Sequence, residues 1–195
     1  MIKKINKNKG FTILETLIAV VLLSLVLNSV LTLISRSLFT AQYAKNDMIA
    51  SYLLQESADY IRNTRDTQMK IDPAVGWGNF LDFYNLNDSN GQQTRVCKIK
   101  IYPGSISSPT APECSNNNGN NAPDVFYYHK DTSGGSYYST EKGSGYADTT
   151  FSRLVVLSKN NSGDEVDVSI TINWKNGNNS KSKSYNLSFT DWQTN

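Results

Sequence analysis

The chain has 195 residues and is poor in the side chains that most often carry catalysis or bind metals. His129 is its only histidine, and Cys97 and Cys114 are its only cysteines. Two cysteines alone cannot form a structural zinc site, and the single histidine has no identifiable partner. The chain also lacks the Gly-x-Ser-x-Gly and His-Glu-x-x-His patterns of serine hydrolases and zinc proteases. The sequence therefore predicts no catalytic residues, no metal site and no cofactor, so we do not expect an enzyme.

Helix-breaking residues are missing from a long early part of the chain. Between Phe11 and Val75 there is no glycine, and Pro73 is the only proline. Apolar residues first form a nearly continuous run and then recur at spacings of three or four, which is the period of a helix with one apolar face. The pattern predicts a single helix over residues 11–67, about 85 Å long at a rise of 1.5 Å per residue.

The two parts of this helix differ in polarity. Residues 11–34 are apolar on all sides and long enough to cross a bilayer of roughly 30 Å. Residues 35–70 are amphipathic, so we expect one face to lie on a sheet.

Acidic residues are missing from the first ten positions, which contain Lys3, Lys4, Lys7 and Lys9. Basic residues ahead of an apolar helix predict that the short amino-terminus stays in the cytoplasm. Without this segment the chain has 15 basic and 17 acidic residues, so the segment is the source of the whole chain's net charge of +2. The remainder has no basic patch that would indicate a nucleic-acid partner.

Three interpretations of the amino-terminus are possible, and they differ in how they account for Glu15, a carboxylate inside the apolar run. A secretory signal peptide has an apolar core of about 7–15 residues before a small-x-small site, and this run is longer and has no Ala-x-Ala after it. A plain single-pass anchor explains the length and the orientation of the run. It does not explain Glu15, because a carboxylate in a membrane segment is costly and normally has a partner.

The third interpretation rests on residues 9–15, Lys-Gly-Phe-Thr-Ile-Leu-Glu, which resemble the class III leader of type IV pilins and related pseudopilins. The resemblance implies that a prepilin peptidase cuts after Gly10 and that Phe11 becomes N-methylated. It also implies that Glu15 pairs with the amino-terminal amine of a neighbouring subunit during assembly. Two costly charges would then neutralise each other in a medium of low dielectric constant.

Two later stretches refine this resemblance. Residues 50–66 are similar to a stretch common in minor pilins, in which a Leu-x-Gln-Glu run precedes an Ile-Arg step. Residues 166–174 are similar to the last alternating strand of V-type minor pilins and I-type pseudopilins. The resemblance implies a minor pilin-like subunit of a type IV pilus or related filament. The alternatives are a pseudopilin of a type II secretion or DNA-uptake system, and a membrane-anchored surface binding module that does not polymerise.

The resemblance also implies partners and a location. The partners are other pilin subunits, the prepilin peptidase, the inner-membrane assembly machinery and, before assembly, the membrane itself. The chain would first span the cytoplasmic membrane once, and then join an extracellular or periplasmic filament.

The fold class expected from these observations is α+β, with the long helix packed on an antiparallel β-sheet meander as in pilins. The expected organisation is a leader at 1–10, a transmembrane and assembly segment at 11–34, an amphipathic helical segment at 35–70, and a globular sheet domain at 71–195. Alternating or apolar runs bounded by turn residues predict five strands. These lie at residues 95–102, 124–128, 151–158, 166–174 and 185–189. The region before the first strand is expected to cover the helix, and residues 103–121 are expected to be a loop.

Cys97 and Cys114 are expected to form a disulfide, because the resemblance places this domain outside the reducing cytoplasm. Closing the loop between them would stabilise the fold by roughly 3 kcal/mol in the chain-entropy model. The alternative is two free thiols packed as small apolar groups.

Residues 129–150 combine Tyr137, Tyr138 and Tyr146 with many serines and glycines. This composition is typical of adaptable binding loops, so an adhesive role is one hypothesis. The alternative is a tether or insertion whose tyrosines pack on the sheet.

Overall fold

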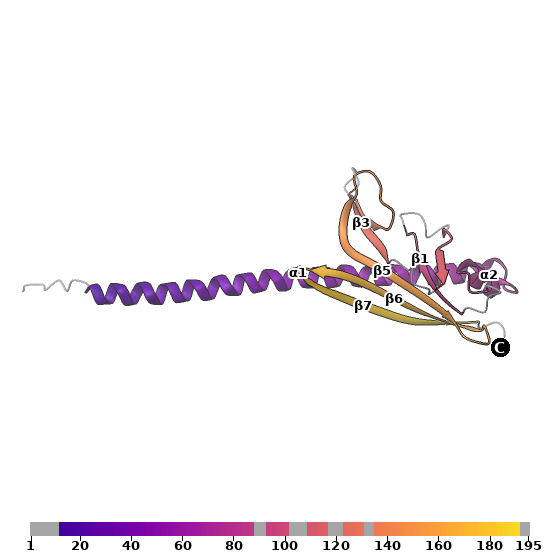
Figure 1. Ribbon diagram of the computed structural model, residues 1–195, viewed down its shortest axis with the longest axis horizontal. Helices are drawn as coiled ribbons and strands as arrows, with labels where there is room; N and C mark the ends of the chain where they lie inside the picture. The colour runs from indigo at the N-terminus through magenta and orange to yellow at the C-terminus, as the bar shows by residue number, and fades with distance from the viewer. Residues whose placement is uncertain (1–11, 88–92, 102–108, 117–122, 131–134, 192–195) are drawn as a thin grey trace, which may run out of the picture. The chain divides into compact units, whose positions relative to one another are not determined.

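The computed structural model describes residues 12–87, 93–101, 109–116, 123–130 and 135–191. Its helices are α1 (Ile13–Ile71) and α2 (Gly76–Phe83), and its strands form one antiparallel sheet (Figure 1). The strands are β1 (Thr94–Lys98), β2 (Glu113–Asn116), β3 (Asp124–Lys130), β4 (Ser136–Ser139), β5 (Ala147–Lys159), β6 (Glu165–Asn176) and β7 (Asn179–Thr190). The α+β fold class predicted from the sequence, a long amino-terminal helix with an antiparallel sheet, is confirmed.

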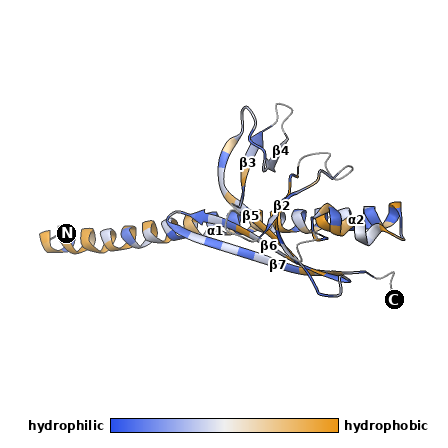
Figure 2. Cartoon of the chain, turned by 45° about the vertical axis from the view of Figure 1, so that its right-hand side comes forward, coloured by the Kyte–Doolittle hydropathy of each residue, from blue (hydrophilic) through white to orange (hydrophobic). Residues whose placement is uncertain are grey.

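The chain divides into two compact units, residues 1–45 and 46–195. In the first unit, α1 is mostly apolar on all sides up to residue 34 and more polar over residues 35–45, and the described side chains of the unit are exposed (Figure 2). Ile13, Leu22 and Leu33, for example, are 86%, 58% and 71% exposed. By length and composition α1 includes a stretch that could cross a membrane. Exposed apolar side chains all around a helix require a lipid or protein environment.

In the second unit, the remaining part of α1 buries one face against the sheet. Its buried residues recur at helical spacing, as the amphipathic pattern predicted. They include Ala50, Leu53, Leu54, Ala58, Ile61 and Thr64. All of these except Thr64 belong to one hydrophobic cluster, which also includes inward-facing residues of the strands and residues of α2. The core of this unit therefore lies between the helix and one face of the sheet.

The centre of the sheet is β5, which pairs with three strands. On one edge it pairs with β6, through residues 152–159. On its other edge it pairs first with β3, through residues 147–153, and then with β1, through residues 155–158. Residues 151–158 are apolar on both faces, a pattern that predicts a central strand, and this is confirmed because both edges of β5 are hydrogen-bonded.

The last three strands form a meander with short turns, as predicted. Every second residue of β6 faces the core and is buried, including Val166, Val168, Ile170, Ile172 and Trp174. The β6–β7 turn has Gly177 at φ +62°, a left-handed conformation that glycine adopts without steric strain. The alternation and the turn together set the register of this hairpin.

Two short strands fall where the sequence predicted no strand. The expected loop at 103–121 includes β2, which pairs with β1, and the tyrosine-rich region includes β4, which pairs with β3. Each has only four residues, too few to show an alternating pattern. The expected first strand at 95–102 ends earlier, since β1 stops at Lys98.

The region between α1 and the first strand contains a helix, α2, that was not predicted, because glycines at positions 76 and 78 are typical of a break in a helix. A β-carbon at Gly76 would lie 2.6 Å from the Cα of Met69 and 2.8 Å from the carbonyl oxygen of Gln68. Glycine is therefore required for α2 to approach the end of α1 closely. The close approach lets Trp77, Phe80 and Leu81 join the core.

Gly76→Ala should lower the free energy of unfolding by about 1–3 kcal/mol, because backbone atoms rather than a flexible side chain would have to move. Urea unfolding of the full chain in detergent micelles measures this. Gly78→Ala is the matched control, since a β-carbon there meets nothing within 4 Å. The control should be neutral or slightly stabilising, by up to about 1 kcal/mol. Equal effects of the two variants would contradict the role given to Gly76.

Candidate functional site

The first turn of α1 contains the acidic residue singled out in the sequence. The backbone N–H of Glu15 donates to the side-chain oxygen of Thr12 at 3.3 Å and to its carbonyl oxygen at 3.0 Å. Thr12 therefore caps the helix, and Glu15 occupies the third helical position, as in a capping box. A carboxylate in the first turn is favoured by the helix dipole. Glu15 thus lies at the end of the apolar helix, two residues after its start, with its side chain exposed.

The other two residues of the predicted processing site, Gly10 and Phe11, lie outside the described residues. The cut between them, the methylation of Phe11 and the pairing of Glu15 remain predictions.

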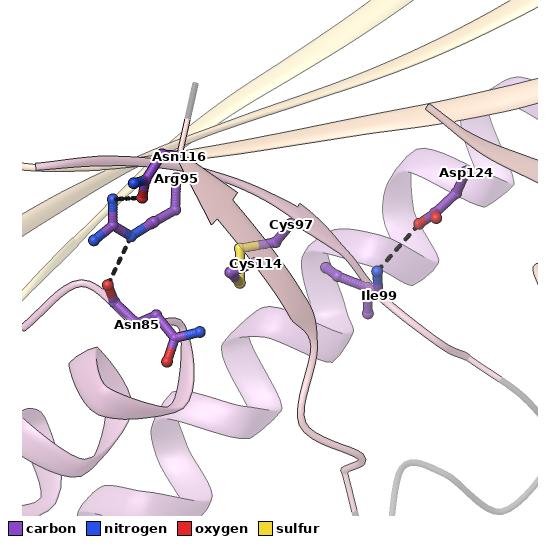
Figure 3. Close-up of a disulfide and its surroundings, with 7 residues drawn as sticks. All are labelled: Asn85, Arg95, Cys97, Ile99, Cys114, Asn116 and Asp124. Atoms are coloured by element: carbon purple, nitrogen blue, oxygen red, sulfur yellow. Dashed lines mark hydrogen bonds between the residues drawn. A yellow bond between two sulfur atoms is a disulfide. The ribbon is translucent and has the colours of Figure 1, made fainter. Parts of the chain in front are cut away.

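The disulfide between Cys97 and Cys114 is present, as expected (Figure 3). The two cysteines are direct partners in the register of β1 and β2. Cys97 faces the core and is 3% exposed. The bond therefore attaches a short edge strand to the strand that pairs with the centre of the sheet.

A buried arginine also links β1 to β2 near the disulfide. Arg95, the residue two positions before Cys97, is 1% exposed. Its Nε donates to the carbonyl oxygen of Asn85 at 2.8 Å, and its Nη1 donates to the side-chain oxygen of Asn116 at 2.5 Å (Figure 3). Arg95 thus links β1 to the end of β2 and to the turn after α2.

The tyrosines of the possible binding loop are divided between the two faces of the β3–β4 hairpin. Tyr137 and Tyr146 flank His129, with ring centroids 4.8 Å and 4.4 Å from its ring, and their hydroxyl groups are 2.9 Å apart. Tyr138 faces the other way and packs on Tyr128 at 5.5 Å and on Phe151 at 6.1 Å. The three tyrosines therefore form no common platform.

These contacts describe a packed structure around His129. Gly143 lies against the ring of Tyr146, since a β-carbon there would come within 2.3 Å of it. The packing holds the β4–β5 loop on the β3–β4 hairpin. This agrees with the alternative stated above, in which the tyrosines pack on the sheet. A binding role for this loop stays a prediction.

Sequence reasoning missed a second buried arginine, which lies where β5 changes partner from β3 to β1. Arg153 is 1% exposed. Its Nη1 donates to the Oγ of Ser57 on α1 at 3.0 Å, and its Nη2 donates to the carbonyl oxygen of Ile99. Nη2 also lies 3.4 Å from the Oδ2 of Asp124 on β3. One guanidinium therefore connects α1, β3, β5 and the residue after β1.

Asp124 completes the connection by accepting the backbone N–H of Ile99 at 3.1 Å (Figure 3). The buried ion pair thus satisfies both backbone groups of Ile99, just past the end of β1, where a strand partner is lost. Burial raises the pKa of the Asp124 carboxyl, and the Arg153 charge acts in the opposite direction. Burial likewise lowers the pKa of the Arg153 guanidinium. The sequence could have indicated that Arg153 is buried, because Arg153 lies two residues from both Phe151 and Val155 and therefore on the same inward face of β5.

No group of three or more metal-ligating side chains occurs within the part of the chain that the structure describes.

One comparison with known proteins bears on these observations. Residues 5–27 match the family model of the prokaryotic N-terminal methylation motif. The match includes Gly10, Phe11, Glu15 and most of the first apolar stretch, and supports the resemblance to type IV pilins first seen in residues 9–15. It supports a substrate of a prepilin peptidase that is anchored in a membrane and joins a filament of the pilus type.

No curated protein matches the chain, and no solved structure matches it. The match to the methylation motif therefore applies to the amino-terminal segment alone.

Proposed function

We propose that this chain is a minor pilin-like structural subunit of a type IV pilus or a related filament. In this proposal the leader, residues 1–10, is removed by the prepilin peptidase. Residues 11–34 first hold the precursor in the membrane and then pack among the helices of neighbouring subunits. Residues 35–70 support the globular sheet domain, residues 71–195, which faces outward.

The observation that carries the proposal is the methylation motif at residues 5–27 joined to an apolar helix whose side chains are exposed. A helix of this kind needs an apolar environment twice, first in lipid and later in a bundle of like helices. The disulfide agrees with a domain outside the reducing cytoplasm.

Mass spectrometry of the mature amino-terminus tests the proposal. The expected result is a chain that begins at Phe11 and carries an N-methyl group. A purified chain that retains residues 1–10 would favour a membrane-anchored binding module that does not polymerise. A pseudopilin would have the same processed amino-terminus. Electron microscopy that shows whether the chain lies in an extracellular filament would distinguish a pilus subunit from a pseudopilin.

Glu15→Ala should strongly reduce incorporation of the subunit into filaments while leaving membrane insertion intact. The reason is that the processed amine of a neighbouring subunit would lose its carboxylate partner in a low dielectric. Immunoblots of sheared filaments measure incorporation, and carbonate extraction of membranes measures insertion.

Two further variants isolate the charge of Glu15. Glu15→Gln keeps the size of the side chain and should fail like the alanine variant, whereas Glu15→Asp should retain incorporation in part. Normal incorporation of Glu15→Ala would contradict the pairing.

A further inference from the structure

The apolar part of α1 is bounded by two charged residues. Glu15 and Arg36 stand at its ends, and the sequence has no charged residue between them. Their separation along the helix is about 32 Å at a rise of 1.5 Å per residue, which matches a hydrocarbon core of about 30 Å. The two charges therefore mark the edges of the stretch that crosses the membrane in the function proposed above.

Asn28 lies well inside this stretch. Along the helix axis it is about 12 Å from Arg36 and about 20 Å from Glu15. Long lysine and arginine side chains near a helix end can extend to the membrane surface, but the side chain of asparagine is too short to do so. In lipid its carboxamide is therefore surrounded by hydrocarbon, where an amide group without a hydrogen bond is costly.

The hydroxyl groups in the same stretch are satisfied by their own helix. Each of them donates to a backbone carbonyl oxygen three or four residues earlier, at 2.8–3.0 Å. They belong to Thr16, Ser24, Ser29, Thr32 and Ser35. The side chain of Asn28, by contrast, forms no hydrogen bond within the described part of the chain. Its carboxamide therefore needs a partner from another molecule.

The side of the helix around Asn28 allows close approach of a second helix. Short side chains recur there at spacings of three or four residues and so share one side of the helix with Asn28: Ser24, Thr32 and Ser35. Val26 and Val30 are each two residues from Asn28 and lie on the opposite side, about 200° around the axis. Short side chains let two membrane helices come close enough for a hydrogen bond between them.

A second copy of this chain offers the matching group at the matching depth. The four lysines of residues 1–10 direct the amino-terminus of every copy to the same side of the membrane, so two copies cross it in parallel. Asn28 then lies at the same depth in both. A carboxamide has N–H donors and a carbonyl acceptor, so two of them can donate to each other reciprocally.

We propose that Asn28 lies at a contact between the membrane helices of two copies of this chain, where the two carboxamides donate to each other and the helices pack along Ser24, Thr32 and Ser35. The inference rests on the membrane stage of the proposed function. It adds a pairing of precursors before assembly that needs neither the processed amino-terminus nor Glu15.

Energy transfer between labelled copies of the full chain in lipid vesicles tests the proposal. The chain keeps residues 1–10, so that pairing of Glu15 with a processed amine plays no part. Cys97 and Cys114 are bonded to each other, so a cysteine introduced as Thr40→Cys provides the thiol for the donor or acceptor dye. The vesicles contain phosphatidylethanolamine and phosphatidylglycerol, and the ratio of protein to lipid is varied.

The expected result is energy transfer that rises with the ratio of protein to lipid and gives a dissociation constant. Asn28→Leu keeps a similar size without the carboxamide and should raise this constant about three- to thirtyfold. Asn28→Gln keeps the carboxamide and should restore most of the association. Ser29→Ala is the matched control, because the Ser29 hydroxyl already donates to the carbonyl oxygen of Leu25, and it should leave the constant unchanged.

Oxidative cross-linking of single introduced cysteines in the same vesicles locates the contact. Ser24→Cys and Thr32→Cys, on the side of Asn28, should form cross-linked dimers. Val26→Cys and Val30→Cys, on the opposite side, should form far fewer.

Several results would overturn the proposal. One is energy transfer no greater than that of randomly distributed copies at the highest ratio of protein to lipid that the vesicles accept. Others are an unchanged dissociation constant in Asn28→Leu, or equal cross-linking on the two sides of the helix. Cross-linking of Thr32→Cys in cells to a different pilin subunit, and not to itself, would make that subunit the occupant. None of these results bears on whether the chain is processed at Phe11, which mass spectrometry tests separately.

Discussion

Replacing Arg153 with methionine should lower the free energy of unfolding by about 3–5 kcal/mol. The substitution keeps much of the side-chain volume but leaves the buried Asp124 carboxylate without its counter-charge. It also removes the donors to Ser57 on α1 and to the carbonyl oxygen of Ile99. A buried acceptor without a donor adds to the loss, because it was desolvated on folding.

Urea unfolding of the full chain in detergent micelles, followed by near-ultraviolet circular dichroism, measures this loss. Arg62→Met is the matched control, since Arg62 forms an exposed ion pair with Asp59 and should contribute less than about 1 kcal/mol. The role of Arg153 would be contradicted if both arginine variants changed stability equally.

The effect of Arg153→Met should also depend on pH. Without the guanidinium, the strongest influence that opposes burial at this site is lost, and the hydrogen bond from the Ile99 N–H and the charge of Lys98 remain, so the pKa of the Asp124 carboxyl should rise further above its usual range. A carboxyl whose pKa is higher in the folded than in the unfolded state destabilises the fold when it is ionised, and this penalty disappears as the pH falls through the folded pKa. The loss caused by Arg153→Met should therefore be smaller near pH 5 than near pH 7.5.

The sequence was most informative where a periodic pattern continued for many residues. The helical spacing of α1 and the alternation in β6 both run over several periods, and each requires one buried face. The long helix, the central position of β5 and the final meander could therefore be predicted from residue patterns alone. At the amino-terminus, the short motif around Gly10 and Glu15 was informative because the apolar run follows it directly.

The sequence was least informative where structure depends on residues distant in the chain. Gly76 looked like a helix breaker, but it is required where α2 meets Met69. β2 and β4 are strands because they pair with β1 and β3, and their own four residues show no alternating pattern. The inward position of Arg153 on an apolar strand was visible in the sequence but was not used, and nothing in the sequence identified Asp124 as its partner.

The disulfide should have its largest effect on β2. With Cys97→Ala and Cys114→Ala combined, we expect a loss of roughly 3 kcal/mol in the free energy of unfolding, because the loop it closes spans 17 positions. β2 is a four-residue edge strand whose only described strand partner is β1. Without the bond, β2 keeps its pairing with β1, the hydrogen bond from Arg95 to Asn116 and the exposed ion pair between Glu113 and Lys100.

Hydrogen exchange of the full chain in detergent micelles separates this local effect from a global one. The amides of residues 113–116 should exchange much faster in the double alanine variant, because β2 can open alone when its covalent link is gone. The amides of β5 and β6 should lose protection only to the extent that global stability falls. Ser182→Ala, on the edge strand β7 with an exposed side chain, is the control and should leave exchange of residues 113–116 unchanged. Equal acceleration in β2 and β6 would show that the disulfide stabilises the sheet as a whole rather than fixing its edge.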